Sequence, residues 1–112
     1  MELKINKIGD IVTIILEGRI DANIAPDIEQ KILSLIAEGA RELVADLSEV
    51  IFISSAGLRA LITALKEAKR KKGDLRLAGV KGRVLEVFEI TGFSTIFQIY
   101  GDVEESIRSF NN

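Results

Sequence analysis

The residues that organise the chain are numbers 45–65, which read ADLSEVIFISSAGLRALITAL. An apolar strand ends early in this stretch, a turn follows, and a second short apolar run reaches Ser54 and Ser55. Apolar residues then recur with the spacing of a helix face, at Leu58, Leu61, Ile62 and Leu65. The pattern therefore predicts two adjacent serines where an extended segment becomes a helix, a position at which hydroxyls cap helices and anions are readily held.

Two strands and a helix are predicted upstream of this stretch. Residues 3–8 alternate between apolar and polar side chains, as in a half-buried strand, and Gly9-Asp10 suits a hairpin turn. Residues 11–16 are almost all apolar, which is typical of a strand covered on both faces. We therefore predict an antiparallel first pair with the first strand at the edge. Asn23 is a candidate N-cap for a helix over residues 25–38.

The rest of the chain alternates between strands and helices. The predicted elements are strands over residues 43–47, 75–78 and 96–100, and helices over 56–71, 84–90 and 103–110, the last with Asp102 as N-cap. Strands separated by helices predict parallel neighbours joined by right-handed crossovers. The predicted fold class is α/β: a single small domain over residues 1–112, with a mostly parallel five-stranded sheet, one antiparallel edge strand and four helices.

The composition excludes several classes of function. The 112 residues are 47% hydrophobic and 29% charged, enough for a core and a soluble surface, and the net charge is −2. So small a charge predicts no attraction to nucleic acid. The chain has no cysteine and no histidine, which removes the commonest metal ligands and the commonest general base. We therefore expect no metal, no cofactor and no enzyme activity.

The hydropathy pattern predicts a cytoplasmic protein. No apolar run approaches the length of a membrane span, and the N-terminal residues contain no signal-peptide core. We therefore expect neither membrane insertion nor secretion.

Three interpretations compete for Ser54 and Ser55. A serine that caps a helix stabilises it by roughly 1 kcal/mol, and every helix needs a start. A catalytic serine on a strand-to-helix elbow is disfavoured, because Ile53 replaces the first glycine of G-x-S-x-G and no histidine is present to activate the hydroxyl. A phosphate on Ser55 would lie at a helix N-terminus and add about −1.5 to −2 charge units. The residues alone leave capping and modification open.

Residues 46–58, DLSEVIFISSAGL, resemble the signature of the STAS domain, the fold of bacterial anti-sigma factor antagonists. The family pattern is roughly Asp-Leu-Ser-x-Val-x-Phe-hydrophobic-Asp-Ser-x-Gly-Leu. GRID at residues 18–21 is similar to the family motif before its first helix, and ITGFSTIF at residues 90–97 resembles the family ending. The resemblance extends along essentially the full chain and implies the STAS fold.

The resemblance implies a binding protein that is switched by phosphorylation. In the family, a serine kinase of the histidine-kinase-like ATPase type doubles as the anti-sigma factor, and it phosphorylates the serine that corresponds to Ser55. The unphosphorylated antagonist binds that kinase and frees the sigma factor. The phosphorylated form lets go, and a phosphatase resets it. The docking face implied for this chain comprises Asp21, Ser54, Ser55, Ala56, Gly57 and Arg59.

The sequence departs from the family at Ser54, where the relatives have an aspartate, and Ser54 is a possible alternative acceptor. Asp21 fits either a surface group beside the switch or a turn residue bonded to nearby backbone. Arg59 fits either a partner contact or a solvated side chain. The alternative function is that of a non-switching STAS adaptor subunit, for instance of a lipid transporter or a larger signalling assembly.

Overall fold

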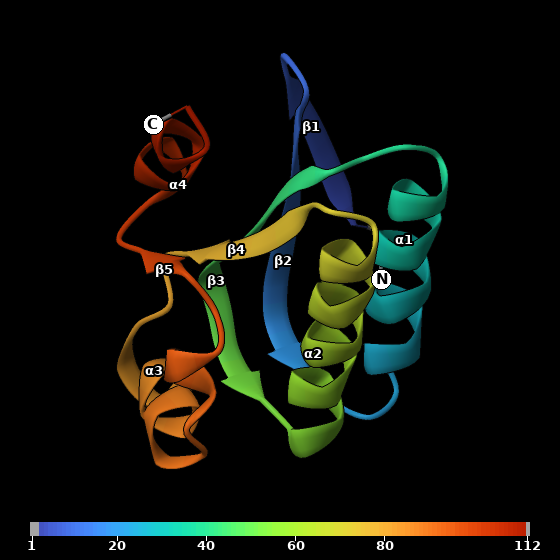
Figure 1. Cartoon of the computed structure of the whole chain (residues 1–112). Helices are drawn as coiled ribbons and strands as arrows, with labels where there is room; N and C mark the ends of the chain where they lie inside the picture. Colours follow the sequence, from blue (N-terminus) through green and yellow to red (C-terminus); the bar gives the residue numbers. More distant parts are fainter. Residues whose placement is uncertain (1–2, 112) are drawn as a thin grey trace.

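The sheet has the same strand order as the chain, β1-β2-β3-β4-β5, in the computed structural model, which describes residues 3–111 (Figure 1). The elements, in order, are β1 (Lys4–Ile8), β2 (Ile11–Ile20), α1 (Ala25–Ala37), β3 (Glu42–Ile53), α2 (Ser55–Arg70), β4 (Asp74–Ala78), α3 (Gly82–Ile90), the 3-10 helix η1 (Phe93–Thr95), β5 (Ile99–Tyr100) and α4 (Val103–Ser109).

The strand pairing confirms the predicted sheet. β1 and β2 form an antiparallel hairpin at one edge, and β2, β3, β4 and β5 pair in parallel. The hairpin turns at Gly9-Asp10, as the sequence predicts, and each parallel step is made through at least one helix. The predicted α/β class, with a mixed five-stranded sheet and four α-helices, is therefore confirmed.

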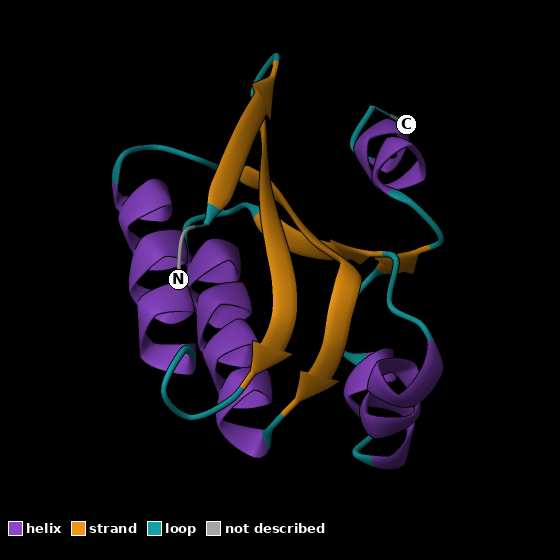
Figure 2. Ribbon diagram, turned by 180° about the vertical axis from the view of Figure 1, so that it is seen from behind, coloured by secondary structure: helices purple, strands orange, loops and turns teal. Residues whose placement is uncertain are grey.

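Helices cover both sides of the sheet. Figures 1 and 2 show α1 and α2 side by side along β2, with α3 and α4 beyond β3. Val84 and Phe88 of α3 belong to the same core as α1 and α2, whereas α4 packs against the other side of the sheet at Val44 and Ala78. Alternate residues of β3 point to the two sides, because Leu43 and Ala45 belong to the main core while Val44 packs with Val103 and Ile107 of α4. Among the described residues, no helix is long and apolar enough to span a membrane.

The two central strands are longer than the sequence predicts. β2 continues to Ile20, and β3 runs unbroken from Glu42 to Ile53, so the turn predicted after residue 47 is wrong. The reason lies in the pairing. From Ile15 to Ile20, β2 advances 5 residues while β3 advances 7, from Asp46 to Ile53, through two shifts of register. The polar residues that suggest a turn are accommodated at the first shift, where Asp46 Oδ1 accepts a hydrogen bond of 3.0 Å from the amide of Ser48.

Two further predictions are corrected. The strand predicted over residues 96–100 is reduced to Ile99–Tyr100 and is preceded by η1, because Phe97 turns inward and packs edge-on against Phe88 at 5.9 Å between ring centroids. Asn23 is not the N-cap of α1, since Ile24 holds that position without a side-chain hydrogen bond. Asp102 is confirmed as the N-cap of α4, and its carboxylate accepts a 2.8 Å hydrogen bond from the amide of Glu105.

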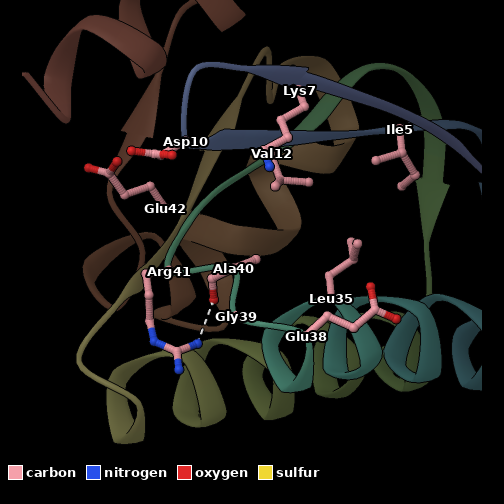
Figure 3. A pocket seen from close by; sticks show the side chains of 10 residues that line it. All are labelled: Ile5, Lys7, Asp10, Val12, Leu35, Glu38, Gly39, Ala40, Arg41 and Glu42. Atoms are coloured by element: carbon pink, nitrogen blue, oxygen red, sulfur yellow. Dashed lines mark hydrogen bonds between the residues drawn. The ribbon is translucent and has the colours of Figure 1, made fainter.

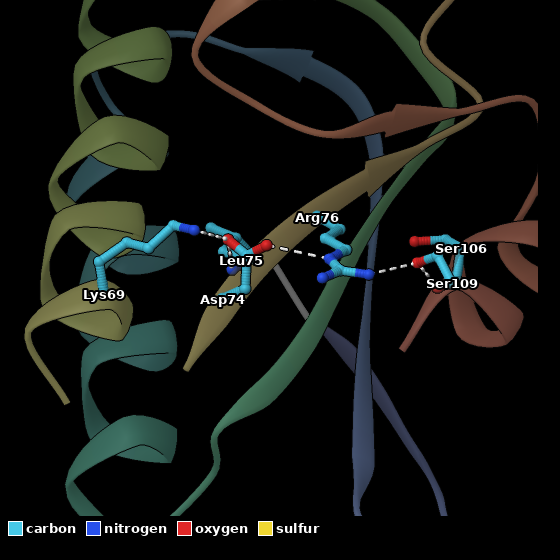
Figure 4. A network of polar contacts seen from close by, with 6 residues as sticks. All are labelled: Lys69, Asp74, Leu75, Arg76, Ser106 and Ser109. Atoms are coloured by element: carbon cyan, nitrogen blue, oxygen red, sulfur yellow. Dashed lines mark hydrogen bonds and ion pairs between the residues drawn. The ribbon is translucent and has the colours of Figure 1, made fainter. Parts of the chain in front are cut away.

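Arg76 of β4 ties α4 to the sheet (Figure 4). Its Nε lies 2.9 Å from Asp74 Oδ2, its Nη1 donates to Ser109 Oγ at 2.6 Å, and its guanidinium lies 4.0 Å from the ring centroid of Phe110. Asp74 is largely buried and also lies 3.3 Å from Lys69 Nζ of α2. The chain of contacts therefore joins α2, β4 and α4 through one largely buried carboxylate.

Replacing Arg76 by methionine should loosen α4, because Asp74 loses its best partner and Ser109 loses its donor. We expect Arg76→Met to lower the free energy of unfolding by about 1–3 kcal/mol in urea titrations, and the α4 amides to exchange hydrogen fastest. The matched control is Arg108→Met, since Arg108 forms only an exposed 3.9 Å ion pair with Glu104 and should cost less than about 0.5 kcal/mol. Equal losses in the two variants would contradict this role of Arg76.

Candidate functional site

Ser54 joins the end of β3 to the start of α2. Its amide donates to the carbonyl of Ile20 at 2.9 Å, which fixes it beside the end of β2. Its own backbone is extended, with φ −87° and ψ 171°, and its hydroxyl accepts from the amide of Gly57 at 3.2 Å. Ser54 is therefore the N-cap of α2, and its hydroxyl is engaged in holding the helix start.

Ser55 differs from Ser54 in both exposure and hydrogen bonding. It is the first residue of α2 and is exposed, and its hydroxyl forms no hydrogen bond within residues 3–111. The hydroxyl is therefore open to a modifying enzyme, whereas that of Ser54 is half-buried and bonded. This difference separates two neighbouring serines that the sequence presents as a pair.

Gly57 brings the first turn of α2 onto the sheet. A Cβ at this position would lie 2.8 Å from Ile20 Cγ2 and 2.8 Å from Ile53 Cγ1, closer than side chains tolerate. The residue is buried and sets the approach of the helix to the sheet, and its contact with a partner stays a prediction. Ala56 beside it is half-buried and remains accessible from outside.

Asp21 and Arg59 flank the two serines in different ways. Asp21 is half-buried and its Oδ1 accepts from the amides of Asn23 at 3.0 Å and Ile24 at 3.3 Å, so it orders the turn into α1. It follows Ile20, whose carbonyl binds Ser54. Arg59 is exposed one helical turn after Ser55, and no acidic group of the described residues forms an ion pair with it.

The sequence does not predict the apolar ledge that precedes the serines, formed by Ile51 and Phe52. Ile51 is 68% exposed and Phe52 is 37% exposed, while Val50 and Ile53 on either side are buried. The second register shift of β3 falls here, and it turns two consecutive side chains outward. The guanidinium carbon of Arg19, on β2, lies 4.2 Å from the ring centroid of Phe52.

The electrostatics of α2 are asymmetric. The first turn contains no acidic residue, so the positive end of the helix dipole is uncompensated beside Ser55. The last turn contains Lys69 and Arg70, which complement the negative end. There the guanidinium of Arg70 donates two 2.8 Å hydrogen bonds to the Glu67 carboxylate and lowers the pKa of that carboxyl. An added negative charge is therefore favoured at the N-terminus of α2.

A groove in the described part of the chain lies away from the serines. It has a volume of about 530 Å³ and lies between the β1–β2 hairpin and the end of α1 (Figure 3). Its floor includes Ile5, Val12 and Leu35, and charged side chains rim it. Val12 lies near the beginning of β2, whereas Ser54 lies beside its end, so the groove and the serines occupy opposite ends of the parallel strands. No group of three or more acidic side chains within residues 3–111 could hold a metal ion.

Comparison with known proteins identifies the family. The family model described as the STAS domain matches residues 2–106, and the chain belongs to that family. BtrV of Bordetella bronchiseptica, described provisionally as an anti-sigma factor antagonist, is 34% identical over 110 residues, which are 98% of this chain and 95% of that protein. The anti-sigma-B factor antagonist of Listeria monocytogenes is 33% identical over 90 residues, covering 80% of this chain and 79% of its own.

Solved structures show the same fold at lower identity. A Thermotoga maritima protein superposes with a TM-score of 0.93 at 19% identity, covering 98% of this chain and 95% of its own. The Bacillus cell fate determinant SpoIIAA, solved in its phosphorylated form, gives a TM-score of 0.77 at 21% identity over 97% of this chain and 99% of its own.

The capping role of Ser54 predicts a stability effect that is separate from function. Ser54→Ala should lower the free energy of unfolding by about 1 kcal/mol, whereas Ser54→Asp should keep the cap and lose much less. The matched control is Ser34→Ala, because the Ser34 hydroxyl only donates to the carbonyl of Lys31 in the last turn of α1. This variant should stay within about 0.5 kcal/mol of wild type. Urea titration followed by circular dichroism measures all three, and a loss in Ser54→Asp as large as that in Ser54→Ala would contradict the cap.

Proposed function

We propose that the chain is an anti-sigma factor antagonist, a binding protein whose affinity for its anti-sigma factor is switched by phosphorylation of Ser55. The observation that carries this proposal is the exposed hydroxyl of Ser55 at the first turn of α2, which forms no hydrogen bond within residues 3–111 and follows the apolar ledge of Ile51 and Phe52 in the chain. Two sequence relatives bear the name of anti-sigma factor antagonist over most of their length. The fold neighbour SpoIIAA has been solved in a phosphorylated form, which supports the same chemistry here.

The partner in this proposal is an anti-sigma factor that is itself a serine kinase of the histidine-kinase-like ATPase type. It transfers the γ-phosphoryl group of ATP to Ser55 Oγ, so that an O–P bond forms, the bond to ADP breaks and the hydroxyl proton is released. A phosphatase hydrolyses the ester and restores the hydroxyl. Ser55 is the acceptor rather than Ser54, because the Ser54 hydroxyl oxygen already accepts a hydrogen bond from the amide of Gly57 and caps α2.

The apolar ledge supplies the binding energy and Ser55 supplies the switch. Two exposed apolar side chains in sequence are costly to leave in water, and burying them against a partner is favourable. A phosphate beside the ledge brings about −1.5 to −2 charge units into the contact, which must then be desolvated. The unphosphorylated chain therefore binds and the phosphorylated chain is released, without any change of fold.

Substitutions at Ser55 test the switch. With the anti-sigma factor and ATP, wild type should accept one phosphate and Ser55→Ala none, while Ser54→Ala should still be phosphorylated at Ser55. Ser55→Asp should bind the anti-sigma factor at least about tenfold more weakly than Ser55→Ala in calorimetry, equivalent to about 1.4 kcal/mol. Phosphate that persists in Ser55→Ala and vanishes in Ser54→Ala would reassign the acceptor. Full binding by Ser55→Asp would favour the non-switching adaptor.

Substitutions on the ledge test the docking surface. Ile51→Ser should weaken binding to the anti-sigma factor about tenfold, because a central apolar contact is lost, while the free energy of unfolding stays within about 0.5 kcal/mol of wild type. The matched control is Ile90→Ser, in which an isoleucine that is 84% exposed on α3 is replaced. Equal weakening by the two substitutions would show that the ledge is not the specific contact.

A further inference from the structure

Arg59 is a charged side chain without an assigned task. It is exposed on α2, four residues after Ser55, and no acidic group of residues 3–111 pairs with it. A cation in the N-terminal part of a helix lies near the positive end of the dipole, which disfavours it. With no acidic residue in the first turn, this cation is also uncompensated. The position therefore suits a negative charge that the unmodified chain does not contain.

The geometry of the helix aims Arg59 at Ser55. Residues i and i+4 are neighbours on a helix surface, about 5–6 Å apart at Cβ. Side chains on a helix lean toward its N-terminus, so the long side chain of Arg59 can reach back to a group on the first turn. An anionic group on Ser55 with a cation four residues later is also the favourable order of the pair.

The neighbouring residues do not compete with a pairing between Arg59 and a phosphate on Ser55. The N-cap residue Ser54 is neutral, so no carboxylate at the N-cap competes for Arg59 or repels a phosphate on Ser55. From the end of β2, Asp21 is occupied with the amides of Asn23 and Ile24, and Arg19 is placed over Phe52. Arg59 is thus the cation of α2 best placed to respond to a charge on Ser55.

We propose that Arg59 pairs with the phosphate of phosphorylated Ser55, and that this pairing withdraws from the anti-sigma factor an arginine that binds one of its carboxylates in the unphosphorylated complex. The proposal rests on the proposed function and specifies how its switch works. Phosphorylation then acts twice: it adds a charge that the interface must desolvate, and it removes a cation that the interface uses.

The intramolecular pair is tested without any kinase, by incorporating phosphoserine at position 55 during translation and titrating it by phosphorus NMR. An adjacent guanidinium favours the dianion and lowers the second phosphate pKa below its ordinary value of about 6. Arg59→Ala should therefore raise this pKa, by at least about 0.2–0.4 pH units, and Arg59→Lys by less. The matched control is Lys66→Ala, which removes an exposed cation farther along α2 and should leave the pKa unchanged. An equal pKa in wild type and Arg59→Ala overturns the proposal, whether or not Ser55 is the natural acceptor.

Binding to the anti-sigma factor tests the withdrawal of Arg59. In unphosphorylated protein, Arg59→Ala should bind at least about fivefold more weakly than Lys66→Ala, and phosphoserine at position 55 should then reduce affinity by a smaller factor than it does in wild type. If phosphoserine lowers the affinity of Arg59→Ala as much as it lowers that of wild type, the proposed role of Arg59 is overturned while the proposed function stands. If phosphoserine leaves the wild-type affinity unchanged while Arg59→Ala raises the phosphate pKa, the proposed function is overturned. The withdrawal of Arg59 from the partner is then overturned as well, and only the ion pair between Arg59 and the phosphate stands.

Discussion

The close approach of α2 to the end of β2 is the constraint on which the site depends. Gly57 has no Cβ, so the first turn of the helix lies directly on Ile20 and Ile53, and the amide of Ser54 reaches the carbonyl of Ile20. This contact fixes the distance between helix and sheet, because protein interiors yield little to an added methyl group. With the helix start held there, Ser54 caps α2 beside the end of β2, and Ser55 faces solvent.

The second constraint is the mismatch in length between β2 and β3. The two additional residues in β3 interrupt the alternation of buried and exposed side chains, and the second interruption leaves Ile51 and Phe52 both outward. Gly18, on β2 opposite this region, has a φ of +72°, a backbone conformation that few other residues adopt without strain. An apolar surface is thereby formed next to the serines without weakening the core, because Val50 and Ile53 still point inward.

The sequence predicts most of the fold because periodicity reports burial directly. It locates four helices, the hairpin and the parallel pairing of the later strands, and the resemblance at residues 46–58 selects Ser55. It does not predict the shifts in β3, because a run of four apolar residues, 50–53, looks buried throughout and only the register against β2 shows otherwise. The sequence also does not predict the different roles of Ser54 and Ser55, because these depend on hydrogen-bond geometry and the two residues are of the same type. Gly57 shows how a residue of the sequence motif can also have a packing role, which becomes visible only in its close approach to Ile20 and Ile53.

The order of the sheet has a consequence for how the chain acquires its structure. Every strand pairs only with the strand before it and the strand after it, so no pairing waits for a distant segment of the sequence. Such a topology keeps the sequence separation between contacting residues short for a parallel sheet, and loop closure costs correspondingly little entropy. The sheet can therefore grow strand by strand from the hairpin toward β5, in the order in which the strands occur in the sequence.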